Sequence, residues 1–201
     1  MSHGKILRWS LIAIVAGLLA SPSRSAVQTV AGRASAARAI TSSLLGGATT
    51  TALADTGSLA AVGDDRNASL ASGGVPPWLT AEVLDALTIS WGDQVVSQAS
   101  TFNPRVSVGG VVVSADFVMS RASAALGQPG DAFSIIDNLS IAGVPVAVTG
   151  APNQTIALPV GRVIVNEQTV SGAGTVAVNA LHAIVPGVAD VIIASSTAGI
   201  Q

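Results

Sequence analysis

Cysteine is absent from this chain of 201 residues, and histidine, lysine and aromatic residues are scarce. Without cysteine the chain has neither a disulfide nor a thiolate metal site. His182 is the one histidine beyond the first 25 residues, whereas zinc sites draw on several nitrogen or sulfur ligands. We therefore expect no metal and no other cofactor.

Charge is also scarce, since charged residues make up 10% of the chain and hydrophobic residues 49%. The single lysine, Lys5, lies in a segment that we expect to be removed. Without residues 1–25, six arginines face eleven acidic residues, a net charge of −5. Nucleic acids and anionic membranes bind clustered cations, so we expect neither as a partner of the mature chain.

The first 25 residues have the layout of a secretory signal peptide. Lys5 and Arg8 precede an uncharged apolar run over residues 10–20, and small residues follow up to Ala26. The run is shorter than the roughly 20 residues that span a membrane. We predict cleavage near Ala26 and a secreted or cell-surface location, with an uncleaved anchor as the alternative.

What the chain has in plenty is alanine, valine and glycine, the last at 21 positions. This composition favours thin, tightly packed strands over a core of large side chains. The length suits one domain. We divide it into an Ala/Thr/Gly-rich part over residues 26–78 and a strand-rich part over residues 79–201.

The clearest strand signals lie between Ile135 and Ala198. Short runs rich in β-branched residues alternate there with Gly, Pro or Asn. The predicted strand segments cover residues 138–146, 161–168, 175–182 and 190–196. Pro145 and Pro159 mark strand ends or a sheet edge, because proline cannot donate to a strand ladder.

The N-terminal part is less regular. For Val27–Ala61 we favour strand and loop over a helix. Gly63–Asn67 reads as a polar loop, without the spaced ligands of a calcium site. Gly73–Trp78 reads as a break that excludes a regular helix or a central strand. Leu79–Leu87 has helical spacing, with Thr80 as a cap, and a strand follows over residues 87–91.

Two further segments complete the prediction. Asp93–Asn103 is polar and small, which suggests a turn followed by an edge strand. From Gly109 a strand begins in which alternate residues share one face. These residues are Val111, Val113, Ala115, Phe117 and Met119.

We therefore predict an all-β fold: a single-domain sandwich of about ten short, mostly antiparallel strands, with at most one brief helix. The alternative is a β-solenoid, since small residues recur. No fixed period of about 20–30 residues is visible, which ranks it second.

Six segments, taken in order, resemble the choice-of-anchor P extracellular domain of bacteria and archaea. They cover residues 113–118, 139–146, 152–158, 165–168, 178–182 and 189–193. The resemblance implies a surface-type domain and no catalytic residues. Only five residues follow Ser196, with no sorting motif or hydrophobic tail, so we expect a released or non-covalently held protein.

Few residues suggest chemistry. A nucleophilic triad would require an activated serine beside His182 and a carboxylate, and no Gly-x-Ser-x-Gly motif is present. We expect no catalytic residues. One polar set stands out, as a binding or proton-transfer cluster or as structural hydrogen-bonding groups, the latter being favoured. Its members are Asn166, Glu167, Asn179, His182 and Asp190. Asp116 is interpreted as a residue that bonds a turn or edge.

Trp78 and Trp91 are the aromatic candidates for binding. Exposed, they would stack on a sugar ring; buried, they would fill the core, and we favour the core. Together these features predict a non-enzymatic structural or interaction protein of the cell surface or matrix. It would associate with itself, with other surface proteins or with glycans. The alternatives are a carbohydrate- or protein-binding adhesin module and, last, a hydrolase.

Overall fold

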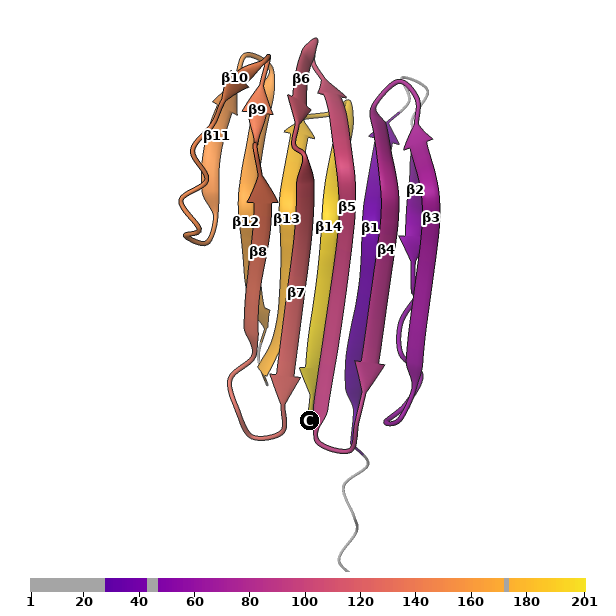
Figure 1. The fold of residues 1–201 in the computed structure, drawn as a ribbon. Helices are drawn as coiled ribbons and strands as arrows, with labels where there is room; N and C mark the ends of the chain where they lie inside the picture. Colours follow the sequence, from indigo (N-terminus) through magenta and orange to yellow (C-terminus); the bar gives the residue numbers. More distant parts are fainter. Residues whose placement is uncertain (1–27, 43–46, 172–173) are drawn as a thin grey trace, which may run out of the picture.

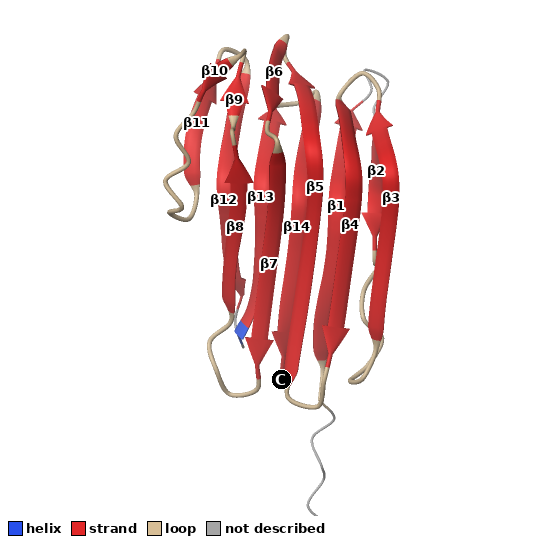
Figure 2. Ribbon diagram, in the orientation of Figure 1, coloured by secondary structure: helices blue, strands red, loops and turns tan. Residues whose placement is uncertain are grey.

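The computed structural model describes residues 28–42, 47–171 and 174–201. Apart from one residue of 3₁₀ geometry at Gly174, the described residues form strands and loops, with no α-helix (Figure 2). None of the described segments is a helix long and apolar enough to cross a membrane. The predicted signal peptide, residues 1–25, lies outside the described residues.

The strands are β1 (Val30–Ser42), β2 (Ala48–Asp55), β3 (Asp65–Val75), β4 (Leu79–Ser90), β5 (Gln94–Val108), β6 (Val111–Ser114), β7 (Phe117–Ala125), β8 (Asp131–Asp137), β9 (Ser140–Ile141), β10 (Val144–Pro145), β11 (Gln154–Leu158), β12 (Gly161–Ser171), β13 (Thr175–Val185) and β14 (Ala189–Ile200).

These strands form two antiparallel sheets that lie face to face (Figure 1). The first sheet has the order β11-β12-β13-β14-β1-β2. The second has the order β10-β9-β6-β5-β4-β3, with β7 also beside β5 and β8 beside β7. The prediction of a β-sandwich is confirmed, whereas the predicted number of about ten strands is too low.

The first and last strands pair in the middle of the first sheet. Val30 of β1 lies opposite Ile200 of β14, and the register continues to Thr41 opposite Ala189. β1 belongs to the part over residues 26–78, and β14 to the part over residues 79–201. The two parts therefore share one sheet.

The two sheets pack more closely than is usual. Cα atoms of β14 lie within 8 Å of Cα atoms in both β5 and β7 of the opposite sheet, whereas stacked sheets are typically about 10 Å apart. Small side chains allow this approach. A Cβ atom on Gly32 of β1 would lie 2.7 Å from the Thr88 hydroxyl of β4. The Ala- and Gly-rich composition thus produces the thin core that it predicts.

Buried hydroxyl groups bridge the sheets between two apolar clusters. Ser120 of β7 and Ser196 of β14 share a 2.7 Å hydrogen bond. Ser97 of β5 donates to the carbonyl of Thr197 at 2.6 Å and also pairs with Thr88. All four hydroxyl-bearing residues are buried. Because each hydroxyl has a partner, these groups fix how the sheets lie on each other without an unpaired polar cost.

A transverse irregularity, which we call the crease, runs across both sheets. In the first sheet, Ala54, Asn166 and Ala194 have φ between 46° and 52° and drop out of the regular pairing. The inward face therefore changes phase. In β14 the buried odd-numbered residues up to Ile193 give way to buried even-numbered residues from Ala194. In the second sheet, Val83, Asn103 and Asn138 have the same left-handed φ.

The crease explains why the predicted helix over Leu79–Leu87 is wrong. These residues belong to the strand β4, in which Leu79 and Leu84 are buried while Val83 and Leu87 are exposed. The phase change at Val83 breaks the alternation of two. The resulting spacing of apolar residues imitates the period of a helix.

Two other predictions are corrected for related reasons. Val111–Met119 is not one alternating strand, because the crease interrupts it at Ala115–Asp116 and divides it into β6 and β7. Both pieces pair with β5. Residues 94–103 of the predicted edge strand therefore lie in a central strand, β5, and the polar segment Gly63–Asn67 already enters β3 at Asp65. For the described residues of Val27–Ala61, the prediction of strand and loop is confirmed by β1 and β2. The predicted break Gly73–Trp78 is only partly observed: a turn covers residues 76–78, but Gly73–Val75 belong to β3, which lies at a sheet edge and not in the centre.

Candidate functional site

The outer face of the first sheet brings together four of the five predicted polar residues. Glu167 of β12 lies directly opposite Asn179 of β13. Asn179 donates its side-chain N–H to Glu167 Oε2 at 2.7 Å. His182 Nδ1 lies 2.7 Å from the same oxygen, and its Nε2 lies 2.6 Å from Asp190 Oδ1 of β14. We call these four residues the histidine cluster.

The imidazole of His182 is clamped at both nitrogens. Each faces a carboxylate oxygen, so both contacts are hydrogen bonds at once only when both nitrogens carry a proton. Neither nitrogen faces a hydroxyl group, and the residue is buried. A general base for a serine nucleophile would need a free nitrogen within reach of that serine. The geometry holds the ring in place and presents no such pair.

Asn166 does not join the cluster. It lies at the crease with φ 52° and is buried. Its side chain donates to the carbonyl of Gly150 at 2.9 Å and accepts from Gln168 at 3.0 Å. It links β12 to the segment of chain between β10 and β11. Asp116 also bonds an edge, since Asn138 donates to it at 2.7 Å.

Beside the histidine cluster, the same face has a polar depression of about 280 Å³. It extends over β1, β2, β13 and β14 and shares Asn179 with the cluster. The pairing of the strands builds it, because one cross-strand row runs from Glu167 through Asn179, Ser195 and Ser35 to Asp55. Small side chains in this row leave the hollow. It is lined by Arg33, Ser35, Arg38, Asp55, Ala177, Asn179, Ser195 and Thr197.

An ion pair closes one side of the depression. Arg33 donates through Nε to Asp55 Oδ1 at 3.0 Å and through a terminal nitrogen to Oδ2, and the N–H of Gly57 donates to Oδ1 at 2.8 Å. Burial raises the pKa of Asp55, but these hydrogen bonds and the charges of Arg33 and Arg38 outweigh it, so its pKa is lowered. The pKa of Arg33 is raised, mainly by its side-chain hydrogen bonds with Asp55.

Arg38 is the cation of the depression that has no partner. It makes no ion pair or hydrogen bond with any described residue, and its Nε is buried without an acceptor. Arg33, by contrast, is occupied by Asp55. Neither Arg33 nor Arg38 was among the predicted site residues. Their signal is absent from local sequence, because the depression forms only when β1 pairs with β14.

The two predicted tryptophans lie at opposite ends of β4. Trp78 precedes the strand and packs against the core, half-buried. Trp91 follows the strand and is 47% exposed. Twelve strand residues separate them, or about 40 Å at the usual rise. They cannot form one stacking platform, and only Trp91 offers an open ring.

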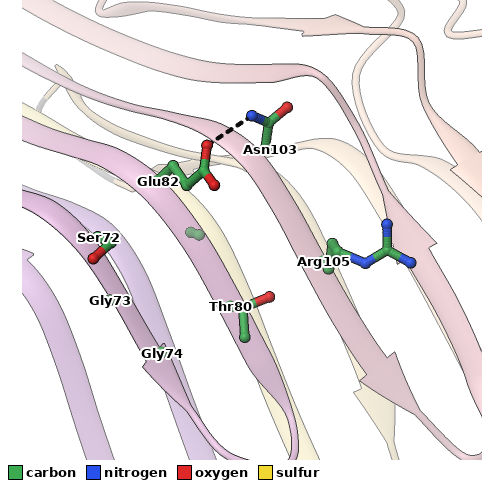
Figure 3. Close-up of a pocket in the computed structure, with 8 residues that line it drawn as sticks. Ser72, Gly73, Gly74, Thr80, Glu82, Asn103 and Arg105 are labelled. Carbon is green, nitrogen blue, oxygen red and sulfur yellow. Dashed lines mark hydrogen bonds between the residues drawn. The ribbon is translucent and has the colours of Figure 1, made fainter.

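A second, wider hollow of about 470 Å³ lies on the outer face of the second sheet. Figure 3 shows Glu82 and Asn103 joined across β4 and β5 by a 2.9 Å hydrogen bond. Arg105 of β5 points away from Gly73 and Gly74 of β3. Asn103 has left-handed φ at the crease. This hollow contains no buried group without a partner, so it carries a weaker indication of binding. It is lined by Ser72, Gly73, Gly74, Thr80, Ala81, Glu82, Asn103 and Arg105.

The described residues contain no group of three or more His, Cys, Asp or Glu side chains arranged to hold a metal ion. Comparisons with protein-family models, with curated proteins and with solved structures give no significant match.

Proposed function

We propose that this chain is an exported, non-enzymatic structural or interaction protein of the cell surface or extracellular matrix. It associates through the sheet edges formed by β2 and β3. The export part of the proposal is supported by the signal-peptide pattern of residues 1–25. The resemblance of six segments to choice-of-anchor P domains supports the surface location.

The observation that carries the proposal is the unprotected character of one side of the sandwich. β2 ends the first sheet and β3 ends the second, and they lie side by side in Figure 1. Charged residues are confined to Asp55 in β2 and to Asp65 and Arg66 in β3. Open edges without lysine, proline or inward charge are templates for pairing with another strand.

The opposite side differs. There the first sheet ends in β11, which is five residues long and uncharged. In the second sheet β10 is two residues long and contains Pro145, and β8 begins and ends with an aspartate, Asp131 and Asp137. Short strands, proline and charge are the devices that block edge-to-edge pairing. The contrast favours the side of β2 and β3 as the one through which copies of this chain pair.

Sedimentation of the mature chain, residues 26–201, over rising concentration tests the proposal. We expect the wild type to associate. A double variant, Thr50→Lys with Leu70→Lys, places one cation on each of the two edge strands and should shift the protein to the monomer. Val170→Lys is the matched control, since Val170 is 70% exposed and lies on β12, away from this edge.

A wild-type chain that stays monomeric at high concentration would contradict the proposal. So would a double variant that associates as strongly as the wild type while its thermal unfolding shows that it is folded.

A separate observation supports the second candidate function, a carbohydrate- or protein-binding module. It is the depression on the outer face of the first sheet, in which Arg38 has no partner among the described residues.

A further inference from the structure

The starting point is a cation whose environment is incomplete. Arg38 Nε is buried and has no acceptor among the described residues. A buried donor without a partner destabilises the fold, and a charged one does so more strongly. The terminal nitrogens of Arg38 are not among these buried atoms and make no hydrogen bond with a described residue, so an acceptor in the depression can reach them. A carboxylate matches the fork of a guanidinium best.

The charges within the lining of the depression favour an anion. Arg33 and Asp55 form an ion pair, which leaves the lining with one net positive charge, that of Arg38. Strand pairing on both sides holds the backbone of Arg38 in the centre of the first sheet. The carboxylates of Glu167 and Asp190 lie outside the lining, in the histidine cluster, where both contact His182.

The rest of the lining selects a ligand rich in hydroxyl groups. The hydroxyls of Ser195 and Thr197 make no hydrogen bond to a described residue. Asn179 uses its N–H on Glu167 and has its carbonyl oxygen left over. The one apolar side chain in the lining is Ala177. A ligand that fills this space needs an anion and several hydrogen-bonding groups, with little apolar surface.

The size of the hollow narrows the ligand further. Pockets for drug-sized ligands measure about 300–1,000 Å³, and this depression, at about 280 Å³, falls just below that range. One sugar ring with a carboxylate meets all three conditions of charge, polarity and size. An acidic peptide also brings a carboxylate, but the only apolar side chain in the lining that its β-carbons would meet is Ala177.

We propose that the depression over β1, β2, β13 and β14 binds a uronate residue of an acidic saccharide. Arg38 pairs with the carboxylate, and Asn179, Ser195 and Thr197 bond the ring hydroxyls. This site lies on the outer face of the first sheet, whereas the association described above uses the edges of β2 and β3. The two proposals are tested by different variants.

Titration calorimetry with a short oligogalacturonate tests the site on the mature chain. We expect binding by the wild type and no binding of the matching neutral oligosaccharide. Arg38→Gln should weaken binding about 10–100-fold, the effect of losing one charge-assisted hydrogen-bonded pair. Arg162→Gln is the matched control, because Arg162 is an exposed arginine on β12 of the same sheet, remote from the depression. It should bind as the wild type does.

Binding measurements with two other carboxylate ligands test whether the depression prefers a saccharide. Acetate and an aspartate-rich peptide should bind at least tenfold more weakly than the saccharide, since neither offers ring hydroxyls. Arg38→Lys keeps the charge but loses the fork, so its affinity should fall between those of the wild type and Arg38→Gln. Thermal unfolding of each variant checks that it is folded.

Three results would overturn the assignment. One is a wild-type chain that does not bind the oligogalacturonate. Another is a folded Arg38→Gln variant with wild-type affinity. The last is an acidic peptide that binds as well as the saccharide, which would make the depression a protein-docking site.

Discussion

At the rim of the depression, Asp55 accepts three hydrogen bonds, two from Arg33 and one from the N–H of Gly57. Burial alone would raise the pKa of Asp55, but these hydrogen bonds together with the charges of Arg33 and Arg38 outweigh that effect, so the pKa lies below its usual range. A lowered pKa in the folded state means that the ionised carboxylate stabilises the fold. This contribution is complete above the unfolded-state pKa of about 3.9 and is lost as the pH falls through the folded-state pKa.

Asp55→Asn should therefore lower stability at neutral pH and matter less in acid. We expect a loss of about 0.5–1 kcal/mol at pH 7, the range for a partly exposed ion pair. The gap to the wild type should narrow below about pH 3.9. Urea unfolding at pH 7 and pH 3 measures both. Asp85→Asn is the control, because Asp85 is exposed and makes no hydrogen bond to a described side chain. A gap that is independent of pH would contradict the assignment.

The residues of the candidate site differ in whether the sequence alone could predict them. The histidine cluster could be named because its four members lie in strand-like segments near one another in the chain, with Glu167 and Asn179 twelve residues apart. Arg38 could not be predicted from the sequence. It reaches the site through the pairing of β1 with β14, and it lies 154 positions before Ile192, its partner in that pairing. Nothing in the local pattern around residue 38 marks this contact.

At the scale of the strand, the crease governs what sequence reasoning recovers. The predicted strands over residues 161–168 and 175–182 are observed, although the crease crosses the first at Asn166, because their β-branched residues mark them as strands independently of strict alternation. Where a strand crosses it, the phase changes and the periodicity misleads, as in β4. Asparagine at positions 103, 138 and 166 is a visible signal of left-handed φ. Ala54, Val83 and Ala194 give none.

Val83 is the costliest of these positions, because a β-branched residue at φ 43° is strained. Its side chain is 56% exposed, so a substitution there loses little packing. Val83→Asn should raise the free energy of unfolding by about 1 kcal/mol, since asparagine tolerates this conformation better. Leu87→Asn, at an exposed site with ordinary strand geometry on β4, should give no gain. Urea unfolding of both variants measures this, and equal effects would contradict the crease geometry.

At the scale of the whole molecule, the question is whether the part over residues 79–201 can stand without the part over residues 26–78. β14 pairs with β1 along its whole length, and β4 pairs with β3. Ala34, Ala36, Ala37 and Ala39 of β1 are all buried in the shared core. A chain without residues 26–78 would expose the middle of the first sheet and one edge of the second, together with the apolar surface that these alanines cover.

A fragment of residues 79–201 should therefore lack a cooperative thermal transition, whereas the mature chain of residues 26–201 should show one. Removing β1 leaves an unpaired row of backbone groups on β14, in the middle of a sheet whose ladder needs them satisfied. It also leaves the core uncovered where Ala34, Ala36, Ala37 and Ala39 of β1 lie in the intact chain. Circular dichroism and amide exchange measure the outcome. A fragment with strand content and slow exchange in β14 would show that residues 26–78 are a separate addition to a fold that is complete without them.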